Sequence, residues 1–395
     1  MSGVRVVMNL FGEEMRRGGA PEPLGGGALA FHRSLPGYEP TPLKTLPALA
    51  HRFGIGKLLV KDEARRFGLN AFKSLGASYA VFRWLGLRSE ATRGYGVSPA
   101  EFISGKLRDI LGDVTFATAT DGNHGRAVAW TAKLAGFDAV IFMPEGSATA
   151  RIEAIKALGA DVRIVPGGYD AAVRTAAAEA EKRGWQVISD TSYAGYTDIP
   201  GWIQEGYYTL MQEITEELEK RGEATPDVMV VQAGVGALAA AVGAYRGWNG
   251  SAPMLISVEP TGAACMLESA AAADGKPHTA TGSGRTIMAG LNCPTPSIIA
   301  WPVIKSSYDA FVAVDDRWAE EAMRLLAFPK SGDPAVTAGE SGAAGLAAIA
   351  AVMSETADAD VRKQLRLTSN ASVLVINTEG ATDPEGYARI IGKRL

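Results

Sequence analysis

The stretch Gly68-Leu69-Asn70-Ala71-Phe72-Lys73-Ser74-Leu75-Gly76-Ala77 places one lysine at the start of a regular apolar pattern. The pattern has helical spacing and predicts a helix with one buried stripe, formed by Phe72, Leu75, Tyr79, Phe82 and Leu85. Beside Phe72 and small residues, the amine of Lys73 loses solvation, which disfavours its charged form and makes it a better nucleophile. A lysine that forms a Schiff base needs this property. Taken alone, however, such a lysine is more often an ordinary surface residue.

Length and charge narrow the classes of function. The 395 residues suffice for two domains or one large α/β unit. A net charge of −4 without a long basic run argues against nucleic acid or a membrane surface as partner. No window approaches the roughly 20 apolar residues of a membrane span, and the N-terminal residues lack an apolar signal core. We therefore expect a cytoplasmic protein that acts on a small molecule.

The chain has two cysteines, Cys265 and Cys293, too few for a disulfide scaffold or a four-cysteine metal site. Both fall in predicted loops of one region, so a pair is geometrically conceivable, but a cytoplasmic protein keeps its thiols reduced and we expect two separate thiols. The four histidines are scattered without metal-ligand spacing, so we predict no metal site.

The order of the predicted elements indicates the fold class. Residues 1–40 are rich in glycine and proline and predict an irregular arm, followed by a helix at Leu46–Phe53 and a strand at Lys57–Glu63. An amphipathic helix is expected at Glu101–Leu111 and a long helix at about Pro200–Lys220. Two series of strands alternate with helices. The strands are Thr115–Thr120, Ala139–Met143, Val162–Val165 and Gln186–Ser189, then Val228–Gln232, Met254–Val258, Phe311–Val314 and Val373–Ile376. This alternation predicts an α/β protein of two doubly wound, mostly parallel-sheet parts, with the active site between them.

The first loop with chemical content is Thr120-Asp121-Gly122-Asn123-His124-Gly125, which lies between a strand and a helix. Backbone amides at a helix N-terminus suit a carboxylate or a phosphate. Asn123 could contact a cofactor oxygen, and His124 either takes part in the chemistry or only supports the turn.

A second loop, Gln232-Ala233-Gly234-Val235-Gly236-Ala237, has glycines that let the backbone approach a phosphate. It lacks the continuation of a dinucleotide fingerprint, so it suits a single phosphate or is merely a tight turn. Later loops offer Thr378, whose hydroxyl could face a ring nitrogen, and Glu340, at the start of another helix. Asp190 either points inward or caps the next turn.

One lysine, an Asn-His-Gly loop, a loop for one phosphate and a late hydroxyl, in this order, resemble the pyridoxal-phosphate (PLP) enzymes of fold type II, the tryptophan synthase β-like family. The resemblance extends from about Pro40 to Gly380 and implies PLP as cofactor, with Lys73 as its Schiff-base lysine. It implies a homodimer with a large domain of residues 1–84 and 200–395 and a small domain of residues 85–199. The implied cofactor-binding residues are Lys73, Asn123, Ala233, Gly234, Val235, Gly236, Ala237, Glu340 and Thr378.

Several stretches resemble the diaminopropionate ammonia-lyases of this family most closely, among them Arg66-Phe67-Gly68-Leu69-Asn70-Ala71-Phe72-Lys73 and Gly290-Leu291-Asn292-Cys293. Asp121 stands where related dehydratases carry Ser or Ala-type residues. Its charge repels a simple amino-acid carboxylate, but suits a substrate with a second ammonium group or a base on the face of Cα opposite Lys73. A helix N-cap is the structural alternative.

We therefore expect α,β-elimination of 2,3-diaminopropionate, L and D, to pyruvate and two ammonia. The implied catalytic residues are Lys73, Asp121 and Asp190, and the implied substrate-binding residues are Ser74, Thr120, Asp121, Gly122 and His124. Lys73 would take the α-proton of one enantiomer and Asp121 that of the other, and Asp121, Asp190 or Lys73 would protonate the leaving amine. The alternatives are a serine/threonine dehydratase of the same fold and a non-catalytic, cofactor-binding homologue.

Overall fold

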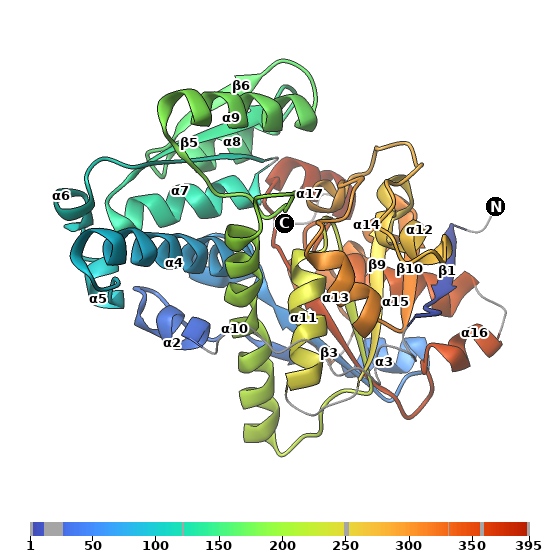
Figure 1. The fold of residues 1–395 in the computed structure, drawn as a ribbon. Coiled ribbons are helices and arrows are strands. Elements are labelled where there is room, and N and C mark those ends of the chain that lie inside the picture. Colours follow the sequence, from blue (N-terminus) through green and yellow to red (C-terminus); the bar gives the residue numbers. More distant parts are fainter. Residues whose placement is uncertain are drawn as a thin grey trace. The chain divides into compact units, whose positions relative to one another are not determined.

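The computed structural model describes residues 3–11, 27–120, 122–248, 253–330, 332–355 and 359–392, and they divide into two compact units (Figure 1). Unit 1 contains Pro40–Arg65, Leu210–Leu395 and the N-terminal segment to Leu24, as far as these are described. Unit 2 contains Arg66–Thr209 and the described part of Gly25–Glu39. Lys73 therefore belongs to unit 2, whereas the predicted large domain extends to residue 84. The division into domains stays a prediction.

Unit 1 is built on a seven-stranded sheet in the order β1-β10-β9-β8-β11-β3-β2. The five inner strands are parallel, and β1 and β2 run antiparallel at the two edges. The bounds in this order are Val4–Met8, Ala310–Val314, Met254–Pro260, Val228–Gln232, Ser372–Asn377, Lys57–Asp62 and Leu43–Thr45. All four strands predicted in the second series are present, and the mostly parallel sheet agrees with the predicted fold class.

The inner strands read as continuous apolar runs because helices cover them. Every residue of β8, β9 and β10 is buried, as in sheets with both faces covered. Helix α15 (Ala344–Glu355) packs on β8, β9, β10 and β11, and α11 (Ala237–Trp248) packs on β8 and on α13 (Ala300–Ser307). The other helices of unit 1 are α3 (Pro47–Phe53), α12 (Cys265–Ala271), α14 (Asp316–Ala327), α16 (Ala359–Gln364) and α17 (Pro384–Ile391).

Unit 2 contains a four-stranded parallel sheet in the order β6-β5-β4-β7. The bounds in this order are Asp161–Val165, Asp138–Pro144, Thr115–Ala119 and Gln186–Val187. Ala117, Val140 and Phe142 form a core cluster with the alanines of α9 (Tyr169–Arg183). Ile141 points the other way, since side chains alternate along a strand, and it contacts α7 (Asn123–Ala135) at Gly125. Helices α9 and α7 therefore cover opposite faces, and α8 (Thr149–Lys156) packs beside α7.

Two long helices labelled in Figure 1, α4 and α10, approach each other near the predicted lysine. Helix α4 (Lys73–Arg93) begins with Lys73 itself and packs against α7. Helix α10 (Asp198–Arg221) begins in unit 2 and passes into unit 1 after Thr209. A Cβ atom on Gly206 of α10 would lie 2.5 Å from the carbonyl oxygen of Leu75, so the backbones of the two helices approach closely there.

Some sequence predictions were wrong in detail. Residues 101–111 form two short helices, α5 (Pro99–Phe102) and α6 (Leu107–Leu111), because Gly105 between them has a φ of 71° that ends helical continuity. The N-terminal arm contains strand β1 and helix α2 (Gly27–Ser34), and its residues 12–26 lie outside the described residues. In the described ranges, each helix is too short or too polar to cross a membrane.

The contact at Gly206 predicts a sharp sensitivity to size. Replacing Gly206 with alanine should lower the free energy of unfolding by about 1–3 kcal/mol, because the added methyl group overlaps the first turn of α4. Urea denaturation followed by circular dichroism measures the change. The matched control is Gly201→Ala in the same helix, where a Cβ atom meets nothing within 4 Å, and we expect it to be neutral or slightly stabilising. Equal effects at the two positions would contradict the assignment of this contact.

Candidate active site

The predicted site residues fall into two groups, one in each unit. Unit 2 contains Lys73, Ser74, Thr120, Gly122, Asn123, His124 and Asp190. Unit 1 contains the loop Ala233–Ala237, Glu340 and Thr378. Asp121 lies outside the described residues. Within each group the structure brings several of these residues together, and the roles assigned to them stay predictions.

Lys73 and Asp190 form an ion pair in unit 2. The Nζ atom of Lys73 lies 2.5 Å from Oδ2 of Asp190 and 5.3 Å from the centre of the Phe72 ring. Both side chains are mostly buried, with 19% and 11% of their surface exposed. Asp190 follows the short strand β7. Because its carboxylate pairs with Lys73, it does more than cap a turn. Its carboxylate points at the lysine amine.

The charges of this pair determine its protonation at neutral pH. Burial alone would raise the pKa of Asp190, but the charge of Lys73 and the hydrogen bond that Lys73 donates outweigh burial and lower the pKa to about 2. Burial lowers the pKa of His124, against the pull of Asp190. At neutral pH the site therefore holds an ionised carboxylate beside a neutral imidazole.

His124 and Thr120 shape the loop before α7. The Nε2 atom of His124 lies 2.8 Å from the carbonyl oxygen of Ile188, and a carbonyl only accepts, so this nitrogen carries the hydrogen. Its Nδ1 atom is buried, and no described residue hydrogen-bonds to it. The Thr120 hydroxyl oxygen accepts hydrogen bonds from the amides of Gly122 (2.9 Å) and Gly125 (3.1 Å), which close the loop. Both residues thus have supporting contacts in addition to the roles predicted for them.

Two more residues of this group lie where helices begin. Ser74 follows Lys73 in α4; its side chain is fully buried and its hydroxyl has no hydrogen-bond partner among the described residues. Asn123 is the first residue of α7 and is half-buried. Ser74 therefore has an unused hydrogen-bonding group beside the lysine.

In unit 1, the side chain of Gln232 links the end of β8 to the segments that contain Ser341 and Thr378. Its side-chain Nε2 atom donates to the carbonyl oxygens of Ser341 (3.0 Å) and Ile376 (2.9 Å) and to the hydroxyl of Thr378 (3.0 Å). Carbonyl oxygens only accept, so they determine which end of the amide faces them. Gln232 was not among the predicted site residues. A glutamine at the end of a buried strand, directly before a glycine loop, is the signal that could have indicated one.

The contacts in unit 1 fit a PLP group. Because the oxygen of Thr378 accepts from Gln232, the hydroxyl hydrogen can be donated elsewhere, and no described residue accepts it. A hydroxyl donor suits an unprotonated ring nitrogen. The loop Gly234–Ala237 lies between β8 and α11, where backbone amides and the helix dipole favour a phosphate. Gly236 has a φ of 98°, and a Cβ atom on Gly234 would lie 3.0 Å from the carbonyl oxygen of Gly290. Glycine is therefore needed at both positions.

Other predicted features surround this loop. Glu340 is buried, and a Cβ atom on Gly386 would lie 3.4 Å from its Oε1. Cys265 and Cys293 are free thiols, as expected, and both approach Gly234: the Sγ atom of Cys265 lies 3.8 Å from its carbonyl oxygen. Among the described residues, no three His, Cys, Asp or Glu side chains gather as a metal site would require.

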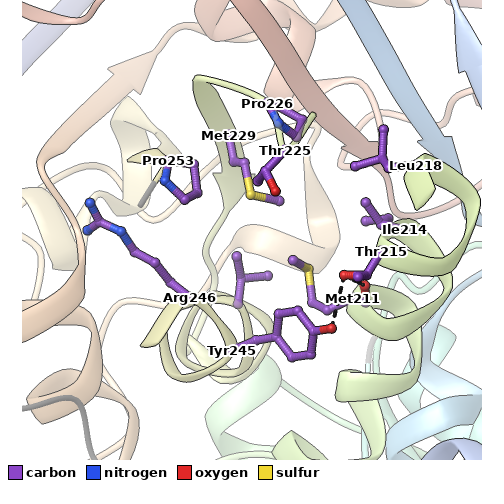
Figure 2. Close-up of a pocket in the computed structure, with 11 residues that line it drawn as sticks. Met211, Ile214, Thr215, Leu218, Thr225, Pro226, Met229, Tyr245, Arg246 and Pro253 are labelled. Atoms are coloured by element: carbon purple, nitrogen blue, oxygen red, sulfur yellow. Dashed lines mark hydrogen bonds between the residues drawn. The ribbon is translucent and has the colours of Figure 1, made fainter. Parts of the chain in front are cut away.

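A small pocket lies elsewhere in unit 1, between α10, α11 and the start of β8 (Figure 2). Its lining is mostly apolar, and three of its polar side chains are paired: Thr215 with the Tyr245 hydroxyl at 3.0 Å, and Arg246 with Asp309 at 3.3 Å. It contains none of the predicted site residues, so we do not assign the chemistry to it. The lining residues are Met211, Ile214, Thr215, Leu218, Thr225, Pro226, Met229, Val242, Tyr245, Arg246 and Pro253.

Comparison with known sequences points to one family. The family model described as pyridoxal-phosphate dependent enzyme matches residues 35–378. The diaminopropionate ammonia-lyase of Salmonella typhimurium is 42% identical over 366 residues, 92% of this chain and 90% of that protein. The same enzyme from Escherichia coli K12 is 42% identical over 367 residues, again 92% and 90%. A catabolic threonine dehydratase of Staphylococcus aureus is 28% identical over 56% of this chain and 59% of its own length.

Comparison with solved structures points to the same family. The crystal structure of diaminopropionate ammonia-lyase from Escherichia coli with an aminoacrylate–PLP azomethine reaction intermediate has a TM-score of 0.88 and 38% identity. That alignment covers 100% of this chain and 98% of the other. The same enzyme with D-serine has a TM-score of 0.89 and 39% identity, covering 99% and 97%. Maize serine racemase, 22% identical with a TM-score of 0.71 and coverage of 94% and 96%, shares the fold. The predicted fold, PLP fold type II, is confirmed.

The Lys73–Asp190 pair predicts a pH-dependent contribution to stability in the cofactor-free protein. The pKa of Asp190 is lower in the folded state, so its contribution is present above its unfolded pKa of about 4 and is lost as the pH falls through about 2. Asp190→Asn should therefore lower the free energy of unfolding by roughly 2 kcal/mol at pH 7, with the difference shrinking between about pH 4 and pH 2. Urea titrations across this range measure it. Asp138→Asn, at an ion pair with 70% of the carboxylate side chain exposed, is the control and should change little. A difference that stays constant down to pH 2 would contradict the pairing.

Proposed function

We propose a function from one premise: the chain belongs to the diaminopropionate ammonia-lyase family of pyridoxal-phosphate-dependent enzymes. The protein catalyses α,β-elimination of 2,3-diaminopropionate, which with one water molecule yields pyruvate and two ammonia molecules. The observation that carries this proposal is the mostly buried ion pair of Lys73 and Asp190 at the start of α4. It supplies an amine that can take and give a proton, held in place by a carboxylate, as an elimination with proton transfer requires.

The described residues suggest how the cofactor is held. Lys73 would bind it covalently through its amine, and the backbone amides of Gly234–Ala237 would hold its phosphate. Thr378 would donate its hydroxyl hydrogen to the ring nitrogen, and Asn123 and Glu340 would contact the ring and its surroundings. When bound, PLP supplies an electron sink that takes up the negative charge developing at Cα. A neutral hydroxyl at the ring nitrogen favours elimination over transamination, because the nitrogen stays largely unprotonated.

Proton transfer is assigned to this chain's own side chains. The amine of Lys73 takes the α-proton from one enantiomer, and Asp121 takes it from the other. The substrate carboxylate binds in the loop of Thr120, Gly122 and His124, with Ser74 nearby. The negative charge of Asp121 in this loop favours a substrate with a second ammonium group.

The β-nitrogen leaves readily only when it is protonated. Beside the charged Lys73 amine, Asp190 has a pKa of about 2 and is therefore ionised at neutral pH, which makes it a poor acid there. The ammonium of Lys73, once it has gained the α-proton, is the better donor to the β-nitrogen. Asp190 then serves to keep that ammonium charged and oriented.

We also propose that the enzyme acts in the cytoplasm as a homodimer. The free thiols of Cys265 and Cys293 are consistent with a reducing compartment, and the homodimer follows from the family resemblance. Light scattering of the purified holoenzyme that gives one chain's mass would contradict the dimer.

The purified protein should release pyruvate from 2,3-diaminopropionate and show a visible absorbance band from bound cofactor. Lys73→Ala should lose both, with activity reduced by at least about a thousandfold, since it removes the anchor and one base. A lactate dehydrogenase-coupled assay measures pyruvate.

Lys156→Ala, at a lysine with 51% of its side chain exposed, is the matched control and should keep the band and the activity. Higher turnover with serine or threonine than with the diamine would favour a dehydratase instead, and an absorbance band without any elimination would favour a non-catalytic homologue.

Asp121→Asn should impair mainly one enantiomer of 2,3-diaminopropionate, because it removes the base from only one face of Cα. We expect kcat/KM to fall by about 100-fold or more for that enantiomer and by much less for the other. Separate assays with the L and D forms measure this. Asp170→Asn, at an exposed carboxylate in the first turn of α9, is the control. Equal losses on both enantiomers would refute the two-face assignment.

A further inference from the structure

Tyr207 packs directly on the turn that carries Lys73. It lies in α10, is fully buried, and its ring centre is 4.7 Å from that of Phe72. A Cβ atom on Gly76 would lie 2.7 Å from its Cε1 atom and 2.8 Å from Cζ, the carbon that bears the hydroxyl. The phenol ring therefore contacts α4 through the residue before Lys73 and the residue three positions after it. Sequence patterns assigned Tyr207 no role.

The hydroxyl of Tyr207 is buried, and no described residue makes a hydrogen bond of standard length and angle with it. An unpaired buried hydroxyl is costly, so such a group calls for an explanation. Burial raises its pKa, the charge of Lys73 and a side-chain interaction with the Lys73 amine oppose this rise, and the charge of Asp190 adds to it. Both charges of the Lys73–Asp190 pair therefore act on this hydroxyl.

The chemistry of Lys73 leaves a task for such a group. The amine must exist both as an ammonium and as a free base, and the ionised carboxylate of Asp190 can only accept hydrogen bonds. The carboxylate accepts hydrogen bonds from the ammonium but cannot donate one to the lone pair of the neutral amine. A phenol hydroxyl can accept from the ammonium and donate to the neutral amine.

We propose that Tyr207 is a positioning residue whose hydroxyl hydrogen-bonds the Lys73 amine in both of its protonation states. The inference rests on the proposed function, in which Lys73 is the cofactor anchor and a base. It follows from the placement of the ring between Phe72 and Gly76, from the unpaired hydroxyl, and from the nearby ion pair. The charged or titratable groups facing the amine are then Asp190 from the loop after β7, His124 from α7 and Tyr207 from α10.

The test measures the reactivity of the lysine in the cofactor-free protein. PLP is added to wild type, Tyr207→Phe, Tyr208→Phe and Lys73→Ala at a series of pH values, the adduct is trapped with borohydride, and mass spectrometry quantifies it at residue 73. Tyr207→Phe keeps the ring on Phe72 but removes the hydroxyl from both forms of the amine, and the charge-assisted bond lost by the ammonium is the stronger of the two. The pH midpoint for capture should therefore fall by about one pH unit. Tyr208→Phe, at the neighbouring buried tyrosine of the same helix, should match wild type.

The outcomes separate the two proposals. Total PLP capture that is as fast in Lys73→Ala as in wild type would overturn the proposed anchor. Capture that depends on Lys73, with a midpoint in Tyr207→Phe that is unchanged or raised, would overturn the role of Tyr207 alone. A lowered melting temperature without a shifted midpoint would mean that Tyr207 only packs.

If Tyr207→Phe does not fold, a crystal structure of the unmodified cofactor-free protein decides the question. The hydroxyl oxygen of Tyr207 should then lie within about 3.2 Å of the Nζ atom of Lys73. A separation beyond about 4 Å without a bridging water would overturn the proposal.

Discussion

The ion pair between Lys73 and Asp190 joins residues 117 positions apart in the chain. Both belong to unit 2, so the pair depends on the fold of that unit. Breaking a mostly buried pair by removing one partner is strongly destabilising, because a charge is left without compensation. The amine can therefore be presented only where several elements position it at once. Lys73 is the first residue of α4, and α10 packs closely against that turn at Gly206. Asp190 lies in the loop after β7.

In unit 1 the predicted cofactor-binding segments are linked by a neutral side chain. The side-chain amide of Gln232 links the end of β8 to the segments that contain Ser341 and Thr378. Because β8 and β11 are parallel neighbours, their carboxyl ends meet at one edge of the sheet. The same amide leaves Thr378 able to donate. The phosphate loop and the hydroxyl are thus linked by one neutral side chain.

Much of this organisation could be predicted from local patterns. The strands of both series were found because buried parallel strands are short apolar runs separated by helices of regular length. Lys73 and the glycine loop were found because each is chemically conspicuous. Strands β1 and β2 were missed since short edge strands have weak patterns, and the helix expected at Glu101–Leu111 was wrong because Gly105 interrupts it. Tyr207 has no local signal of chemistry, and the position of Gln232 before a glycine loop does not identify its partners. The contacts of both come from residues distant in the chain.

The sequence by itself determined the family, the fold class, the cofactor and the residue types available for the reaction, because each depends on short motifs in a particular order. The tertiary structure alone decided which partners those residues have. Asp190 could have capped a turn, and only the folded unit shows its carboxylate against Lys73. His124 could have faced a substrate with either nitrogen, and only its contact with Ile188 shows which nitrogen carries the hydrogen. Hydrogen bonds and charge pairs act over a few ångströms, and such distances between remote residues exist only in the folded chain.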